Sequence, residues 1–518
     1  MVDLYLRRLL ALWIVALLVA GCAESTPQPL PPYWPTDGWR TSTPEQQGMD
    51  SPSLASMFDS IQEQHANIHS LLIVRHGYLV TEAYFYPFRP DLKHNLHSCN
   101  KSITSALVGI AIQEGLLKGV NQPILELLPQ PKVTDSDPRK QAITLEHLLT
   151  MTSGLDWQEE IPYSSPRNSA IQMYRRQDWI QYVLGSPMAD EPGGKFNYNS
   201  GGSHLLSAIV QKSAGMSTLA FAQTRLFQPL GISDVFWPTD PQGINTGGGG
   251  LDLTPRDMAK FGYLYLRGGV WDGQQIVPAE WVKVSAEEHI GTHWGWGYGY
   301  QWWIRPGGGY SAIGWAGQYI FVLPDQDMVV IFTGGLKSES VIPEEIVDNF
   351  IIPAVKSPNS LPENPGGVEL LTAKIKAAGQ PEPKPVPPLP PIAQEVSGKT
   401  YVMAYNDMGW RTFSLSFAEK EARLDLLTRN DHFKWLIGLD NVFRQTQVNR
   451  YDPFWQVNGS LVLRGFWQDD QTFVLYGQVL GQADSLEIRF TFARDSVDVQ
   501  WKGWVEDVSE FASGKLQD

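Results

Sequence analysis

The chain has 518 residues, of which 42% are hydrophobic and 18% charged, a balance typical of a folded protein with room for more than one domain. Its formal net charge of −15 provides no basic surface for nucleic acid, so a nucleic-acid partner is excluded. The only two cysteines are Cys22 and Cys99, too few for a disulfide framework.

Residues 1–22 are predicted to be an export signal. Arg7 and Arg8 precede an apolar run, Leu9 to Ala20, which is too short to cross a bilayer comfortably as a helix. The run ends in Val-Ala-Gly-Cys22, which resembles the lipobox of bacterial lipoproteins. We therefore expect a cell-envelope lipoprotein held at the membrane through acylated Cys22, with a plain signal peptide or an uncleaved anchor as the alternative. The Pro-rich residues 23–36 would form a tether.

Residues 37–356 are predicted to form one α+β domain. Asp50-Ser51-Pro52 is typical of a helix start, and residues 71–85 indicate two strands joined at His76-Gly77. Residues 100–240 are mainly helical in pattern, and strands return between 298 and 334. This order predicts one antiparallel sheet completed by both ends of the domain, flanked by helices, with a helical lobe inserted between the strands.

The remaining chain divides into two parts. Residues 357–393 contain PEPKPVPPLPPI and are predicted to be a semi-rigid linker. Residues 394–518 contain about seven short alternating runs separated by turn residues, which predict an accessory all-β barrel or sandwich.

The stretch HSCNKSI, residues 97–103, places Ser98 three residues before Lys101. This spacing is weak evidence alone, but the following SITSALVGIAIQEGLL is apolar nearly all round and predicts a buried helix. A lysine one turn from a serine can activate it as a nucleophile if burial lowers the lysine pKa. The alternative is a hydroxyl that only caps a structural helix. Cys99 is expected to be a small buried hydrophobe and Ser102 a supporting hydrogen-bonder.

Two later stretches favour the catalytic interpretation. Tyr198-Asn199-Ser200 lies in a Gly-flanked segment before another apolar helix, where Tyr198 could be a second base or a proton shuttle. Trp315-Ala316-Gly317 begins a strand, where Gly317 permits close backbone approach. The N–H of Gln318, on an expected edge strand, could be an oxyanion donor.

The order Ser-x-x-Lys, Tyr-x-Ser, Trp-x-Gly over residues 37–356 resembles the penicillin-binding-protein and class C β-lactamase superfamily. It is more similar to the family VIII carboxylesterases and the 6-aminohexanoate-dimer hydrolases than to true β-lactamases. The resemblance implies that Ser98 forms an acyl-enzyme, Lys101 is its base and Tyr198 relays protons to the leaving group. It also implies an oxyanion hole made by the N–H groups of Ser98 and Gln318, and substrate contacts from Ser200, Trp315 and Gly317.

Two departures from the pattern of that superfamily bear on the substrate. Ser200 stands where an asparagine is usual, and Trp315 replaces the β-lactamase lysine that faces a substrate carboxylate. Ser200 can still hydrogen-bond near Lys101, but it lacks the asparagine side chain through which an amide would be recognised. The Trp315 replacement argues against efficient β-lactam hydrolysis and favours uncharged substrates, so a small ester, amide or peptide is expected. The alternatives are a D-alanyl or D-amino-acid peptidase, a weak β-lactamase, or a catalytically silent lipoprotein that binds surface glycans or proteins through residues 394–518.

No cofactor or metal is expected, because the ten histidines form no metal-binding motif. The glycine run 247–250 follows no strand and lacks a P-loop lysine, so it is expected to be a turn or a site-lining loop. The sequence indicates no particular protein partner.

Overall fold

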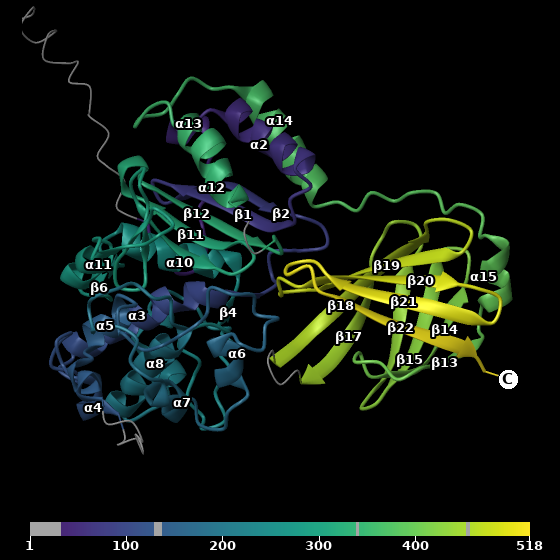
Figure 1. The fold of residues 1–518 in the computed structure, drawn as a ribbon. Coiled ribbons are helices and arrows are strands. Elements are labelled where there is room, and N and C mark those ends of the chain that lie inside the picture. The colour runs from purple at the N-terminus through teal and green to yellow at the C-terminus, as the bar shows by residue number, and fades with distance from the viewer. Residues whose placement is uncertain (1–32, 129–136, 338–340, 452–455, 518) are drawn as a thin grey trace, which may run out of the picture. The chain divides into compact units, whose positions relative to one another are not determined.

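The computed structural model describes residues 33–128, 137–337, 341–451 and 456–517 (Figure 1). The predicted signal segment with Cys22, and residues 23–32 of the predicted tether, lie outside these residues. Among the residues described, no helix is both long and apolar enough to cross a membrane.

The first domain is built on an eight-stranded antiparallel sheet with strand order β2-β1-β12-β11-β10-β9-β8-β7 (Figure 1). The strands are β1 Ile68–Arg75, β2 Tyr78–Tyr84, β7 Ile290–Gly291, β8 Gly297–Tyr298, β9 Trp303–Ile304, β10 Tyr310–Gly314, β11 Gln318–Leu323 and β12 Met328–Gly334. Early strand β1 pairs with late strand β12, with Leu72 opposite Ile331. This pairing confirms that both ends of the domain complete one sheet.

Helices cover both faces of this sheet, because alternate residues of each strand point to opposite sides. On one face, Met328, Val330 and Phe332 of β12 join the core beneath α2 (Ser51–Glu63) and α12 (Ile342–Ile346). On the other face, α10 (Pro255–Leu266) approaches closely at Gly262, where a Cβ would lie 2.7 Å from Val329 Cγ1. Asp50 caps α2 by accepting a hydrogen bond from the N–H of Ser53, as the sequence predicts.

The helical lobe lies between β2 and β7 in the chain. Its helices are α3 Asn100–Gln113, α4 Ile124–Leu127, α5 Leu145–Leu149, α6 Ser169–Tyr174, α7 Trp179–Gly185, α8 Ser200–Ala214, α9 Thr218–Ala222, α10 and α11 Ala279–Ser285. Two short ribbons, β3 (His94–Asn95) with β4 (Asp252–Leu253) and β5 (Val270–Trp271) with β6 (Gln274–Gln275), accompany them. Every residue of α3 from 100 to 111 is buried, which confirms the predicted buried helix.

The structure differs from expectation in residues 357–393. Helix α14 (Pro365–Ala378) lies within the predicted linker and packs against α2, with Leu371 in the core and Ile375 beside it. Residues 357–364 and 381–390 of this segment are irregular, and the second stretch, which holds most of the prolines, leads into α15 (Pro391–Val396). Prolines on both sides obscured a helical spacing of apolar residues, so the linker was predicted too long.

The C-terminal strands form a barrel, which decides between the two predicted β architectures. They are β13 Thr400–Met403, β14 Trp410–Phe417, β15 Glu421–Thr428, β16 His432–Gly438, β17 Arg444–Tyr451, β18 Gln456–Trp467, β19 Thr472–Val479, β20 Ser485–Phe492, β21 Ser496–Gly503 and β22 Ser509–Leu516. Pairing of β16 with β18 closes the ring, with β17 paired to β18 outside it. Aromatic side chains in mutual contact, such as Tyr401, Phe413 and Phe490, fill the interior.

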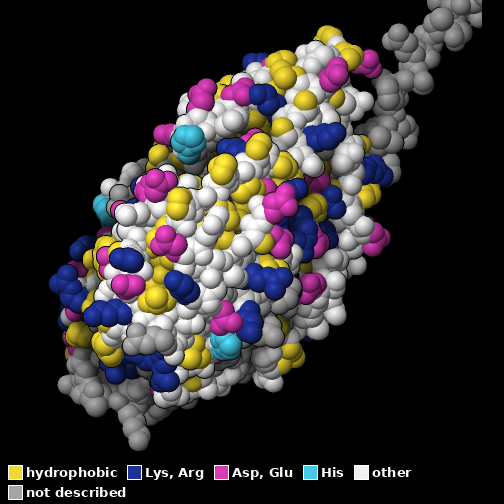
Figure 2. All heavy atoms as spheres, turned by 90° about the vertical axis from the view of Figure 1, so that its right-hand side faces the viewer, with side chains coloured by type: hydrophobic (Ala, Val, Ile, Leu, Met, Phe, Trp, Pro, Cys, Tyr) yellow, Lys and Arg dark blue, Asp and Glu magenta, His cyan; other side chains and the backbone are white. Residues whose placement is uncertain are grey.

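The face shown in Figure 2 carries Lys and Arg side chains interspersed with Asp and Glu, and its hydrophobic side chains are scattered among them. Such a mixed surface is typical of a folded domain in contact with water. Residues Pro35–Asp518 form a single compact unit, which contains both the sheet domain and the barrel.

Candidate active site

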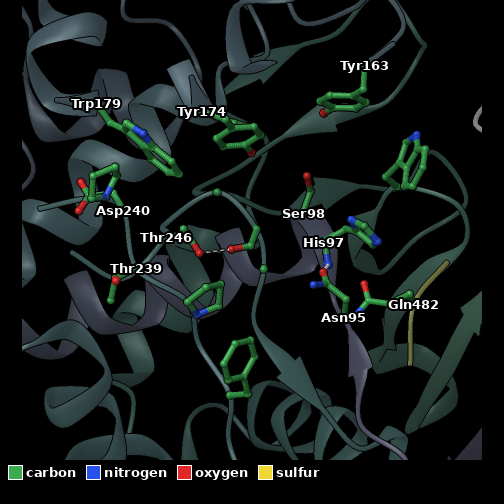
Figure 3. A pocket seen from close by; sticks show the side chains of 18 residues that line it. Asn95, His97, Ser98, Tyr163, Tyr174, Trp179, Thr239, Asp240, Thr246 and Gln482 are labelled. Carbon is green, nitrogen blue, oxygen red and sulfur yellow. Dashed lines mark hydrogen bonds between the residues drawn. The ribbon is translucent and has the colours of Figure 1, made fainter. Parts of the chain in front are cut away.

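Ser98 lies in a tight 3-10 turn, His97–Cys99, which leads directly into α3. The N–H of Cys99 donates to the carbonyl of Leu96 at 3.1 Å, and the N–H of His97 donates to Asn95 Oδ1 at 2.9 Å. His97 has a positive φ of 45°, uncommon for a residue with a side chain. The turn places Ser98 at the wall of a cavity of about 260 Å³ (Figure 3).

Lys101, in the first turn of α3, reaches back to this serine. Its Nζ lies 2.8 Å from Ser98 Oγ and donates to the carbonyl of Gly248 at 2.7 Å. The side chain is only 2% exposed. Burial lowers the Lys101 pKa from its ordinary 10.5 to about 8, while Glu159 and Cys99 act in the opposite direction. At pH 7 about one amine in ten is then neutral, compared with about one in three thousand for an unperturbed lysine.

The glycine run 247–250 brings the carbonyl of Gly248 to Lys101. A Cβ at Gly247 would lie 2.0 Å from the carbonyl oxygen of Ser203, and one at Gly248 would lie 2.9 Å from that of Ser200. Side chains at these two positions would push the run away from α8. Gly248, Gly249 and Gly250 also line the cavity, which confirms the predicted site-lining loop.

Tyr198 lies close to the amine of Lys101. The Lys101 Nζ is 4.7 Å from the centroid of the Tyr198 ring, and Trp303 stacks on this ring at 6.0 Å. Burial raises the Tyr198 pKa well above its ordinary 10, with smaller increases from Tyr298 and Glu159, while a hydrogen bond with Ser98 acts in the opposite direction. The phenol is therefore protonated at neutral pH and can donate a proton.

Glu159 is a buried carboxylate behind the second motif, and the sequence did not single it out. It accepts hydrogen bonds from the N–H of Ser200 at 2.8 Å, the Ser200 hydroxyl, Trp157 Nε1 at 2.6 Å and the Tyr163 hydroxyl at 2.9 Å. Ser200 does line the cavity, but its hydroxyl is bonded to Glu159. In the sequence Glu159 is one half of a Glu-Glu pair that is typical of a surface, so its burial could not be read from the chain.

Asn199 occupies the middle position of this motif and has a structural role. Its Oδ1 accepts a hydrogen bond from the N–H of Gly202 at 2.8 Å, which caps the N-terminus of α8. The cap fixes the direction in which α8 begins, and with it the positions of Tyr198 and Ser200 on either side.

Trp315, of the third motif, lines the cavity beside the turn His97–Cys99. Its ring meets His97 edge-on at 5.2 Å and Tyr163 edge-on at 6.1 Å. Gly317 has φ of 95°, and a Cβ there would lie 2.8 Å from Leu336 Cδ1. The glycine therefore makes room for the Leu336 side chain.

Gln318 begins β11, which lies between β10 and β12, so the expectation of an edge strand was wrong. Its side chain is buried and bonds with the backbone of Trp315 and Gly334. At the opposite position on β10, a Cβ on Gly314 would lie 3.2 Å from the Ser98 nitrogen. The turn end of the β10–β11 hairpin thus passes directly beside the backbone nitrogen of Ser98.

Two neighbours of Ser98 have the supporting roles expected of them. Cys99 is fully buried, its Sγ donates to the carbonyl of Gln318 at 3.3 Å, and burial raises its thiol pKa. The Ser102 hydroxyl donates to the carbonyl of Gln301 at 2.6 Å. Among the residues described, no three His, Cys, Asp or Glu side chains are grouped so that they could hold a metal ion.

Other residues that line the cavity come from segments without a motif. They are aromatic or polar side chains, including Tyr163, Tyr174, Trp179, Asp240 and Gln482 (Figure 3). Asp240 is paired with His204 at 3.0 Å. The first three belong to the irregular segment between α5 and α8 or its short helices, and Gln482 belongs to the barrel.

A helix-flanked antiparallel sheet with a Ser–Lys pair at the start of a buried helix defines a serine hydrolase of the β-lactamase fold. The Beta-lactamase family model matches residues 45–337, more than half of the chain, and the chain therefore belongs to this family.

Three similar proteins carry related names. The 6-aminohexanoate-dimer hydrolase of Paenarthrobacter ureafaciens is 26% identical over 56% of this chain and 79% of its own, and esterase EstB of Burkholderia gladioli is 26% identical over 36% and 52%. A solved structure from Bacillus anthracis, provisionally named a 6-aminohexanoate-dimer hydrolase, is 21% identical with a TM-score of 0.53, covering 63% of this chain and 89% of that one. The solved structure supports the fold.

Proposed function

We propose that this serine hydrolase cleaves small uncharged esters or amides through an acyl-enzyme on Ser98. The observation that carries the proposal is the 2.8 Å contact between Ser98 Oγ and the buried amine of Lys101, whose pKa is lowered to about 8 by burial. A base must be within hydrogen-bond reach of the proton that it removes and partly neutral at the working pH, and Lys101 satisfies both conditions.

In the proposed reaction, neutral Lys101 takes the Ser98 proton as Oγ bonds to the substrate carbonyl carbon. The N–H groups of Ser98 and Gln318 would stabilise the oxyanion. Tyr198 then gives its proton to the departing alkoxide or amine and recovers one from the Lys101 ammonium, which leaves an ester on Ser98. Water attacks this ester by the same route in reverse, passing its proton through Tyr198 to Lys101, and Lys101 returns a proton to Ser98.

The lining of the cavity favours an uncharged substrate. Trp315 stands beside the nucleophile, and among the described residues that line the cavity none is Lys or Arg. A substrate carboxylate would lose its hydration there without a cation in compensation. The names of the similar hydrolase and esterase indicate amide and ester bonds, which agree with this chemistry.

The direct test is turnover of a short-chain nitrophenyl ester by the wild-type protein, Ser98→Ala and Ser102→Ala. We expect Ser98→Ala to lose turnover and remain folded. Ser102→Ala, which removes a hydroxyl four residues further along the chain, is the matched control and should retain turnover of the ester. Full activity in Ser98→Ala would contradict the proposal, and faster cleavage of D-Ala-D-Ala peptides or a β-lactam than of esters would favour the peptidase or β-lactamase alternative.

We also propose that the protein is exported and held at a membrane by lipid on Cys22. The proposal rests on the apolar run that ends in Val-Ala-Gly-Cys22. Cys22→Ser should move the protein from the membrane fraction to the soluble fraction of a bacterial host, and an unchanged distribution would contradict it.

A further inference from the structure

We propose that the C-terminal barrel completes the substrate cavity and contributes to its specificity. Gln482 would bind an amide group of the substrate, and Glu506 would position the segment that carries Tyr163. This inference rests on the proposed function, since it takes the cavity at Ser98 as the substrate site.

The turn between β19 and β20, residues 480–484, lies against the strand that precedes the nucleophile. The carbonyl of Gly481 accepts a hydrogen bond from the N–H of Asn95 at 2.8 Å. Gly481 has φ of 84°, and a Cβ there would lie 2.5 Å from the carbonyl oxygen of Lys93. A Cβ on Gly335 would likewise lie 2.3 Å from the carbonyl oxygen of Ala483. Two glycines thus permit a backbone contact that brings the barrel turn to the site.

That contact places two carboxamides together at one side of the cavity. Gln482 and Asn95 both line it, and Figure 3 shows them side by side near His97 and Ser98. Asn95 Oδ1 is already occupied by the N–H of His97. Within the described parts of the chain, neither Asn95 Nδ2 nor the Gln482 carboxamide has a hydrogen bond to another residue, so both can serve a ligand. A carboxamide is uncharged and both donates and accepts hydrogen bonds, so these two side chains match the N–H and C=O groups of an amide in the substrate.

A second barrel turn, between β21 and β22, holds the segment that carries Tyr163. The Glu506 carboxylate accepts one hydrogen bond from the N–H of Tyr163 at 2.7 Å and another from the N–H of Ser164 at 2.6 Å. The Tyr163 side chain lines the cavity and donates to Glu159. Glu506 therefore fixes the backbone from which a cavity residue projects, and we assign it as a positioning residue.

An apolar contact joins the two turns to the third motif. Ala483 and Val505 of the barrel pack with Ala316 and Trp315, and the first three of these residues are almost fully buried. Removing the barrel would uncover these side chains and leave Trp315 without one of its supports. The contact explains how the barrel can influence a site whose nucleophile, base and tyrosine all belong to the other domain.

The first test compares an amide-bearing nitrophenyl ester, N-acetylglycine nitrophenyl ester, with an alkyl nitrophenyl ester of equal length. Gln482→Ala in the full chain should lower the ratio of kcat/KM for the amide ester to that for the alkyl ester by about 3- to 10-fold, the effect of one lost hydrogen bond. Gln471→Ala, an exposed glutamine on another turn of the barrel, is the matched control and should keep the wild-type ratio. A Gln482→Ala ratio within twofold of wild type would overturn the assignment of Gln482.

The second test concerns Glu506. Glu506→Ala should raise KM for the amide ester about tenfold, since two hydrogen bonds to a charged acceptor are lost. Glu506→Gln keeps one acceptor oxygen and should fall between Ala and wild type, while exposed Glu419→Gln should match wild type. An unchanged KM in Glu506→Ala, or a Gln variant as impaired as Ala, would overturn the positioning role.

Labelling of Ser98 by a fluorophosphonate, measured in parallel, separates the two proposals. If Ser98 of the wild-type protein is labelled, but Gln482→Ala keeps the wild-type ratio of kcat/KM values and Glu506→Ala keeps the wild-type KM, this inference alone is overturned. Absence of Ser98 labelling in the wild-type protein would overturn the proposed function and this inference with it.

Discussion

The charge of Glu159 should shift the pH at which the enzyme becomes active. In the proposed reaction neutral Lys101 accepts the Ser98 proton, and burial lowers the Lys101 pKa to about 8. Below that pH, kcat/KM should fall about tenfold per unit, to about 1% of its plateau at pH 6. Glu159 raises the Lys101 pKa, in opposition to burial. Glu159→Gln should therefore move the acidic limb of the pH profile, the range in which kcat/KM rises with pH, to lower pH.

For each variant, kcat/KM at each pH must be divided by that variant's own plateau value, because Glu159→Gln has a second effect. Four hydrogen-bond donors meet the two carboxylate oxygens of Glu159. In Glu159→Gln the side-chain NH₂, itself a donor, would face one or more of these donors. The plateau value of kcat/KM and the free energy of unfolding should therefore both fall. Other groups near Lys101 should not supply the limb: burial lowers the His97 pKa to about 3 and raises those of Cys99 and Tyr198 above their ordinary values.

The assay is kcat/KM for a short-chain nitrophenyl ester between pH 5.5 and 9.5, corrected for spontaneous hydrolysis. Glu160→Gln is the matched control, because Glu160 is the adjacent glutamate, is 40% exposed and lies 3.4 Å from His293. Its profile should coincide with that of the wild type. A Glu159→Gln limb that stays in place or moves to higher pH would refute the reasoning.

Three further changes have definite expected outcomes. Tyr198→Phe should lower kcat by about 10²- to 10⁴-fold in steady-state kinetics, as expected for loss of a proton-transfer group, and near-wild-type kcat would exclude that role. Gly248→Ala would place a methyl group 2.9 Å from the Ser200 carbonyl oxygen and displace the acceptor of Lys101, so we expect at least about tenfold lower kcat/KM with an unchanged circular dichroism spectrum. Leu371→Ala should lower the free energy of unfolding by about 2–5 kcal/mol in urea titration without changing kcat/KM, and a smaller cost would mean that α14 is not part of the core.

The parts of the site that the sequence predicts are those encoded by short spacings on regular elements. Ser98 and Lys101 are one helical turn apart, and the apolar residues that follow them predict the burial that lowers the lysine pKa. The second motif, Tyr198-Asn199-Ser200, could similarly be predicted because an apolar helix directly follows it. In each case the neighbours in the chain are also the neighbours in space.

The residues that sequence reasoning missed depend on long-range contacts. Glu159 is buried only because an irregular segment folds over α8, and Gln482 reaches the cavity from a strand turn more than 380 positions after Ser98. The position of β11 in the middle of the sheet similarly depends on how β10 and β12 pair around it. No local periodicity encodes such contacts, so they could be recognised only in the folded chain.

The central claim is a covalent ester on Ser98, and peptide mapping of the quenched reaction tests it most directly. Protein mixed with a nitrophenyl ester and acid-quenched within milliseconds should carry the acyl mass on the peptide containing Ser98, and more rapidly at pH 8 than at pH 6. The Ser98→Ala protein should carry none. Turnover without an adduct, or an acyl group found on Cys99 or Ser102, would contradict the account.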